Sequence, residues 1–132
     1  MDRKPRHLDF TTFSLAHANA HLVAGAILDE PRTVDLANLR RLLRRFIETL
    51  DIGGDYATGL VRTADTTEIQ CWFSSAAGAQ AFAAWCDARP TERYTGFETQ
   101  RCFVIDASFA AALKSAVAPS PTGRRPGRPR RT

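Results

Sequence analysis

Residues 34–50 carry the strongest structural constraint in this chain of 132 residues. Their apolar side chains recur at the i, i+3, i+4 and i+7 spacing of a helix that packs one face on a core. Thr33 or Asp35 can cap the start of such a helix, and Gly53 and Gly54 follow its end, as glycine commonly does. The segment therefore predicts one long amphipathic helix, with these apolar positions: Leu36, Leu39, Leu42, Leu43, Phe46, Ile47 and Leu50.

Three further stretches have the character of strands. Residues 21–28 form a compact apolar run, which fits a buried strand, although a buried helix would read the same way. Residues 56–62 and 67–73 are two strand-like runs whose four-residue connection suits a hairpin. Residues 99–106 are apolar on both faces around Phe103. The sequence thus predicts a sheet of four strands.

Two more helices are expected. Ser74 and Ser75 can open an alanine-rich helix that runs to about Ala88 and ends before Pro90. Asp106 or Ser108 can cap a short final helix over residues 109–117. Residues 8–15 alternate weakly and are predicted as an extra N-terminal strand. Residues 16–20 are predicted as a connection, with a helix beginning at Ser14 as the competing interpretation.

The order strand, helix, hairpin, helix, strand is the ferredoxin-like βαββαβ arrangement of the α+β class. Its usual form is a four-stranded antiparallel sheet with both helices on one face. We expect residues 1–7 to be a flexible N-terminus, residues 8–118 a single domain and residues 119–132 a disordered tail rich in proline and arginine.

The second face of this sheet should be polar if it meets water, and it is not. Residues 21–28 and 102–105 offer apolar or small side chains on both faces, and Trp72 adds an aromatic ring. A bare apolar face usually marks an interaction surface. We favour a homodimer joined through this face; the alternative is cover from residues 8–15 or 109–117 of the same chain.

Residues 21–106 resemble the dimeric α/β-barrel proteins of the antibiotic-biosynthesis-monooxygenase type. The resemblance is carried by the apolar run 21–28, the helix 34–50, the glycines from Gly54 to Gly59, and the passage from Gln70 to Ala77. It implies a barrel that binds small aromatic ligands or haem, and in some members oxidises them. Where such proteins often have a histidine in the second helix, this chain has Trp85 and Cys86.

The tail concentrates the charge of the molecule. Residues 1–118 contain 13 Lys or Arg and 14 Asp or Glu, whereas residues 119–132 contain five arginines and no acid. The tail resembles an AT-hook, in which an extended Arg-Gly-Arg-Pro core lies in the DNA minor groove; here Gly127, Arg128 and Pro129 match and Pro126 replaces the first arginine. We expect nucleic-acid contacts, to DNA or RNA, from Arg124, Arg125, Arg128, Arg130 and Arg131.

Other candidate sites are local. The predicted long helix carries a second set of candidate phosphate contacts, whose competing interpretation is a solvated face: Arg40, Arg41, Arg44 and Arg45. A ligand pocket on the second sheet face would use Tyr56, Glu68, Gln70 and Trp72. His17 and His21 are spaced as metal ligands on a helix but lie about 13 Å apart on a strand, so we expect no metal and no cofactor.

Three cysteines without a C-x-x-C pair are expected to be reduced thiols, mostly buried: Cys71, Cys86 and Cys102. With no membrane span and no signal peptide in the sequence, we expect a cytoplasmic protein. Motifs for hydrolysis or nucleotide binding are absent from the sequence. The leading prediction is a non-catalytic accessory or regulatory protein whose dimeric core presents the tail to nucleic acid. The alternative is a small-molecule-binding or monooxygenase-like dimeric barrel protein.

Overall fold

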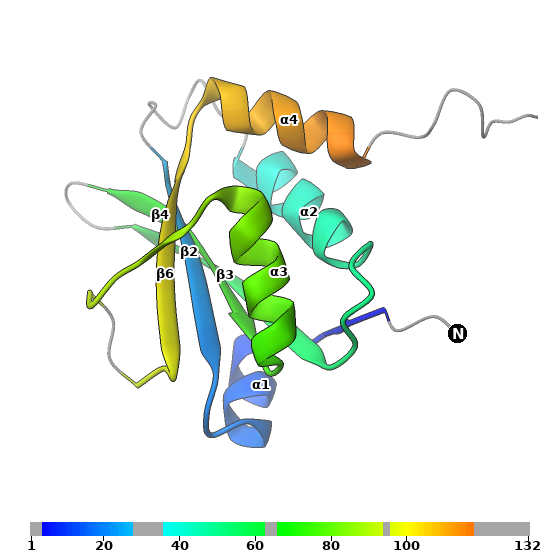
Figure 1. Cartoon of the computed structure of the whole chain (residues 1–132), viewed down its shortest axis with the longest axis vertical. Coiled ribbons are helices and arrows are strands. Elements are labelled where there is room, and N and C mark those ends of the chain that lie inside the picture. Colours follow the sequence, from blue (N-terminus) through cyan, green and yellow to red (C-terminus); the bar gives the residue numbers. More distant parts are fainter. Residues whose placement is uncertain (1–3, 28–35, 63–65, 94–95, 118–132) are drawn as a thin grey trace, which may run out of the picture.

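The computed structural model describes residues 4–27, 36–62, 66–93 and 96–117. This part of the chain forms four helices and one open, mixed sheet of six strands, so the α+β class is confirmed. The helices α2, α3 and α4 lie on one side of the sheet, and α1 lies at its lower end (Figure 1). We call the side under α2, α3 and α4 the main face and the other side, which carries Leu22, Ala57 and Trp72, the opposite face.

The predicted strands form where their apolar runs indicated. β2 (His21–Ile27) pairs antiparallel with β4 (Thr67–Phe73), which pairs antiparallel with β3 (Asp55–Arg62). β6 (Thr99–Ile105) pairs with β2 on the other side. Two strands of two residues each complete the order β1-β3-β4-β2-β6-β5: β1 (Arg6–His7) and β5 (Arg89–Pro90).

The expectation of a purely antiparallel sheet is wrong, because β6 runs parallel to β2 and β1 runs parallel to β3. The ferredoxin-like arrangement would need β6 to follow α3 directly and run against β2. Instead the chain turns back after α3 as β5, which is antiparallel to β6. β6 therefore starts at the same end of the sheet as β2, with Thr99 beside His21.

Local signals set the helix bounds. α2 (Leu36–Ile47) buries Leu39, Leu43, Phe46 and Ile47 against the main face. It ends before the two glycines, and Gly53 and Gly54 instead adopt positive φ values of 63° and 75° in the turn into β3. Its predicted start at residue 34 and the capping candidates Thr33 and Asp35 lie outside the described residues.

α3 (Ala76–Cys86) is capped as predicted, because the Ser75 hydroxyl accepts a hydrogen bond from the Gly78 amide at 3.1 Å. α4 (Ala107–Val117) begins after Asp106, whose carboxylate accepts the Phe109 amide at 2.8 Å. α4 packs against α2 across the upper end of the sheet (Figure 1). Both helices confirm their predicted positions to within two residues.

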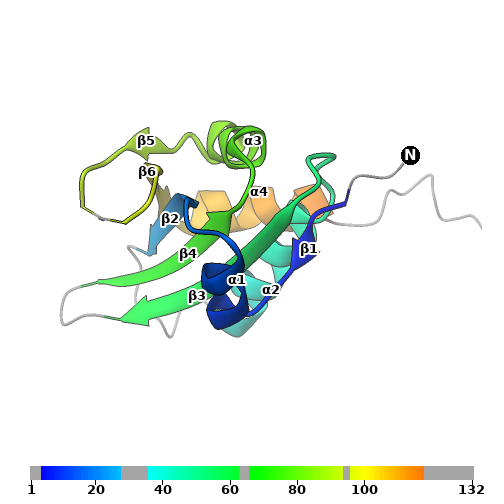
Figure 2. The same cartoon turned by 90° about the horizontal axis from the view of Figure 1, so that it is seen from below.

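The predicted extra strand over residues 8–15 is wrong, because Phe10–Ala16 forms the helix α1. Asp9 caps it by accepting the Thr12 amide at 3.0 Å and the Thr12 hydroxyl at 2.6 Å. The preceding residues Arg6 and His7, expected in a flexible end, pair with β3 as β1. Figure 2 shows α1 and β1 beside β3, away from α3.

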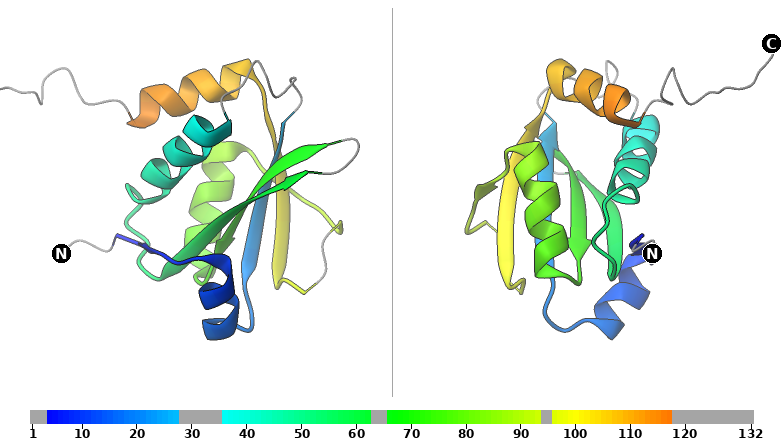
Figure 3. Two further views of the ribbon diagram at one scale, coloured as in Figure 1. Left: turned by 180° about the vertical axis from the view of Figure 1, so that it is seen from behind. Right: turned by 45° about the vertical axis from the view of Figure 1, so that its right-hand side comes forward.

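Two apolar clusters result. The larger lies between the main face and α2, α3 and α4 and is centred on Phe82 and Phe73. The smaller lies on the opposite face and consists of Phe13, Ala20, Leu22, Ala57 and Trp72. Seen from behind in Figure 3, α3 lies beyond the strands and α1 covers the lower end of the near face. Cover from residues 8–15 is thus present, whereas α4 packs on the main face and covers none of the opposite one.

Candidate functional site

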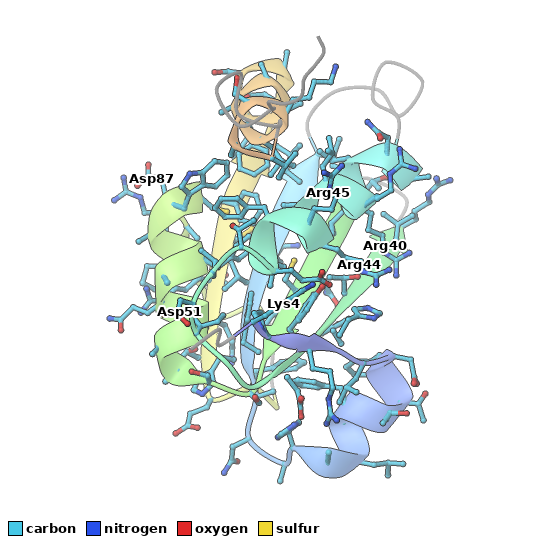
Figure 4. All side chains as sticks on the ribbon, turned by 90° about the vertical axis from the view of Figure 1, so that its right-hand side faces the viewer. Lys4, Arg40, Arg44, Arg45, Asp51 and Asp87 are labelled. Atoms are coloured by element: carbon cyan, nitrogen blue, oxygen red, sulfur yellow. The ribbon has the colours of Figure 1, made fainter. Side chains whose placement is uncertain are left out.

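The arginines of α2 form the first part of the candidate nucleic-acid interface. Arg41, Arg44 and Arg45 are exposed and Arg40 is half-buried, because the helix turns its leucines to the core. Figure 4 shows Arg40, Arg44 and Arg45 along α2, with Lys4 nearby. Arg40 donates to the Thr58 carbonyl at 3.1 Å, and Arg41 donates to the Asn38 side chain. Within the described residues, none of these arginines forms an ion pair with a carboxylate.

Glu48 follows α2 and lies four residues after Arg44. Its carboxylate accepts the Tyr56 hydroxyl at 2.6 Å and pairs with Lys4 at 3.5 Å. Burial would raise the pKa of Glu48, but the hydrogen bond from Tyr56 and the charge of Lys4 outweigh it and lower the pKa. Glu48 is therefore an ionised anchor between β3, α2 and the N-terminal segment. The charge of Arg44 adds a smaller contribution to the lowered pKa of Glu48, while the Arg44 side chain is exposed.

His7 lies next to the arginines of α2. It lies on β1 with its ring 5.2 Å from that of Tyr56. Burial is the main cause that lowers the pKa of His7. The charge of Arg44 and, less strongly, that of Arg40 lower it further, while Glu48 and Asp9 oppose this effect. The pairing of β1 with β3 thus adds His7 and Lys4 to the arginine face. Sequence reasoning missed both residues, because nothing in the first seven residues indicates a parallel strand pair.

The four residues of the predicted ligand pocket do not line one pocket. Trp72, Gln70 and Glu68 alternate along β4 on the opposite face, whereas Tyr56 is buried on the main face against Phe73. Trp72 packs against Phe10 with ring centroids 4.3 Å apart, so an intramolecular contact fills the place of an aromatic ligand. Its indole Nε1 is buried without a hydrogen-bond partner in the described part of the chain.

Glu68 is 3% exposed and forms an ion pair with Arg93, which also lies 3.6 Å from the Cys102 sulfur. Arg93 therefore covers the middle of the opposite face, between β4 and β6. The sequence gives no sign of this contact, because the two residues are 25 positions apart and the segment around Arg93 has no periodic pattern.

The histidines and cysteines form no common site. His17 Nε2 donates to the Asp55 carboxylate at 2.8 Å, while His21 lies on the main face beside Thr99. Over residues 4–27, 36–62, 66–93 and 96–117, no three His, Cys, Asp or Glu side chains gather as a metal site would need. Burial raises the pKa of the Cys71 thiol to about 12 and that of Cys86 further, so neither is a thiolate at neutral pH.

The five tail arginines lie in residues 118–132, outside the described residues. α4, which ends at Val117, packs against α2, so the described chain ends on the helix next to the arginine face. None of the helices in the described part of the chain has the length and apolar character to cross a membrane.

Comparison with known protein families, with characterised proteins and with solved structures finds no match to this chain. The resemblance to dimeric α/β-barrel proteins and the partial resemblance to an AT-hook therefore stay predictions.

Proposed function

We propose that this protein is a nucleic-acid-binding accessory or regulatory protein, which uses its arginine-rich tail together with the arginine face of α2. The observation that carries the proposal is the charge distribution. Five arginines without an acid follow a domain of near-zero net charge. Among the described residues, Arg44 and Arg45 form no ion pair with a carboxylate. Both lie on α2, the helix that α4 packs against.

The two regions have different roles in this proposal. The tail supplies counterion release, which dominates the affinity of proteins for phosphate backbones. The α2 face supplies a fixed row of guanidinium groups, which orient the domain on the polymer without reading its sequence. Prolines at positions 126 and 129 favour an extended tail that can follow a groove or a single strand.

The test is binding of the full chain to duplex DNA and to RNA over a salt series. We expect replacement of all five tail arginines by glutamine to reduce the slope of log K against log salt by about 4.5, since each phosphate contact contributes about 0.9. The pair Arg128→Ala and Arg130→Ala should remove about 2 of this slope. Unchanged binding by the five-glutamine variant would exclude the tail as the contact.

The contribution of the α2 face is tested with Arg44→Ala and Arg45→Ala, against Arg62→Ala and Arg89→Ala as exposed arginines elsewhere on the domain. We expect the first pair to reduce the salt slope by about 1 per residue in contact, and the second pair to leave it unchanged. Equal effects of the two pairs would show that only net charge matters and would reject a defined interface on α2.

A homodimer through the opposite face remains part of the proposal, because two tails on one polymer would raise avidity. Part of this face is not covered by α1 or Arg93. It includes Val61 and Val104, which are 37% and 48% exposed and lie in one row across the sheet. Light scattering of the full chain should give twice the monomer mass, and Val104→Glu should halve it. A monomeric mass for the unaltered chain would remove the dimer from the proposal and leave the tail unaffected.

A further inference from the structure

A cavity of about 180 Å³ opens on the main face, at the end of the sheet where β2 and β6 begin. Ala76, Ala79 and Gln80 line it from one side of α3, at i, i+3 and i+4. His21, Thr99 and Arg101 line it from the first residues of β2 and β6. The parallel register of these strands places His21 directly beside Thr99, so the cavity is a consequence of the unpredicted direction of β6.

His21 is held in one orientation in this cavity. It is 7% exposed, and its Nδ1 lies 3.1 Å from the Thr99 hydroxyl, within hydrogen-bond distance. Its Nε2 is 3.9 Å from the Glu98 carboxylate, beyond hydrogen-bond distance. The hydrogen bond to Thr99 therefore fixes the ring, and Nε2 keeps the capacity to bond a ligand.

Arg101 gives the cavity its charge. It lies on the same face of β6 as Thr99 and Phe103, and it is half-buried. Among the described residues it forms no ion pair with a carboxylate. A guanidinium group presents a planar fork of donors that matches the two oxygens of a carboxylate, and the Gln80 amide adds a donor from α3.

The volume and the rim restrict the ligand further. Each water occupies about 30 Å³ in the liquid, so the cavity has room for a molecule of only a few heavy atoms. It is smaller than the roughly 300–1,000 Å³ of sites for drug-sized ligands. Glu98, close to His21 at the rim, disfavours a doubly charged anion such as phosphate. We infer that this cavity binds a small monocarboxylate, with the carboxylate on Arg101 and Gln80 and a polar substituent near His21.

This site is distinct from the arginine face of α2 and does not depend on the proposed nucleic-acid function. The experiment uses the full chain at constant ionic strength, with sodium acetate, sodium lactate and inorganic phosphate as probes and chloride as the balancing anion. The readout is the NMR signal of the His21 ring during each titration. We expect saturable shifts with the two carboxylates, and with lactate tighter than acetate, because its hydroxyl group can bond Nε2 of His21.

Two variants and one matched control locate the binding. Arg101→Gln should weaken lactate binding by about tenfold or more, which corresponds to loss of a charge-assisted hydrogen bond. Ala76→Leu should fill the cavity from an exposed helix position and abolish the shifts, while Ala77→Leu, its exposed neighbour outside the cavity, should keep them. A variant with all five tail arginines replaced should bind lactate like the unaltered chain.

Shifts that do not saturate, or that persist equally in Arg101→Gln and Ala76→Leu, would overturn the assignment. Phosphate binding tighter than lactate would overturn the choice of a monocarboxylate. Because the tail variant keeps the cavity and Arg101→Gln keeps the tail, failure of this inference and failure of the proposed function are separable.

Discussion

The two faces of the sheet are built from similar apolar strands but are covered in different ways. On the main face three helices enclose a continuous set of aromatic rings, in which Phe82 contacts Phe46, Phe73 and Phe103. On the opposite face the helix α1 covers one end and a single arginine, Arg93, covers the middle. The main face is therefore stabilised by one large apolar core, and the opposite face by a smaller apolar cluster together with a few polar contacts.

This difference predicts how each face tolerates change. A core enclosed on all sides relaxes little when a side chain is removed, whereas a core at the edge of a domain can collapse into the space. The stability that ion pairs and charged hydrogen bonds contribute depends on pH and salt, whereas the contribution of apolar packing depends much less on either. Three predictions, from the largest effect to the smallest, test this contrast.

The largest effect is expected from removal of one buried phenylalanine on each face. Phe82 and Phe13 are 0% and 1% exposed, so both substitutions to alanine remove the same buried atoms. We expect Phe82→Ala to lower the free energy of unfolding by about 4–5 kcal/mol and Phe13→Ala by about 3 kcal/mol. Urea unfolding at 25 °C measures both, and Phe82→Leu replaces Phe82→Ala if the latter does not fold. Equal losses would show that the two faces are equally enclosed.

The sequence predicted the parts of this contrast that depend on local pattern. The amphipathic period of α2, the cap at Ser75 and the apolar runs of β2, β3, β4 and β6 are all contained in short windows. What it missed depends on the path of the chain over longer distances. The direction of β6 is set by the return of residues 89–98 along the sheet, and no single residue there fixes that path.

The candidate sites follow the same division. The exposure of Arg41, Arg44 and Arg45 follows from the helical period and could be predicted. Tyr56 and Trp72 lie on opposite faces because side chains alternate along the two strands of the hairpin. The sequence pattern did not fix the register of that hairpin, so this separation could not be predicted. The His21 cavity could not be predicted, because it exists only when β2 and β6 begin side by side.

A smaller effect is expected from adding one methyl group to each face. A Cβ at Gly25 would lie 2.6 Å from both Ile105 Cδ1 and Phe103 Cζ, and a Cβ at Gly59 would lie 2.8 Å from the Trp72 ring. We expect Gly25→Ala to cost about 2 kcal/mol and Gly59→Ala about 1 kcal/mol, within the usual cost of overpacking. The difference arises because Trp72 rests on Phe10, which is 44% exposed and can move.

The same pair of variants has a spectroscopic readout. With Trp85 replaced by phenylalanine, the emission of Trp72 reports its surroundings. We expect Gly59→Ala to shift this emission to longer wavelength, because the displaced ring becomes more exposed, and Gly25→Ala to leave it unchanged. If Gly59→Ala instead lowers the free energy of unfolding as much as Gly25→Ala does, and the emission of Trp72 does not shift, the opposite face is as rigid as the main face.

The smallest effect is expected from the polar contacts of Asp55 that attach α1 and the N-terminal segment to β3. Asp55 at the start of β3 accepts a hydrogen bond from Arg6 at 3.1 Å and contacts His17 Nε2, at the end of α1, at 2.8 Å. Burial would raise the pKa of Asp55, but the hydrogen bonds with His17 and Arg6 and the charge of Arg6 outweigh it and lower the pKa. A carboxyl group whose pKa is lower in the folded state stabilises the protein above its unfolded pKa, about 3.9, and loses this contribution as the pH falls through the lower folded value.

We therefore expect Asp55→Asn to lower the free energy of unfolding by about 1 kcal/mol at pH 7, the scale of a partly exposed charge-assisted contact. The difference from the unaltered chain should shrink below pH 4 and continue to shrink as the pH falls through the lowered folded pKa of Asp55, because protonated Asp55 is neutral like asparagine. Asp87→Asn is the control, since this exposed carboxyl lies away from α1 and asparagine tolerates its left-handed backbone conformation. Urea unfolding at pH 7, 4 and 2 and constant ionic strength measures all three chains. A loss in Asp55→Asn that is the same at pH 7 and pH 2 would show that the charge of Asp55 does not stabilise the attachment of α1, and would reject a pH-dependent contact on the opposite face.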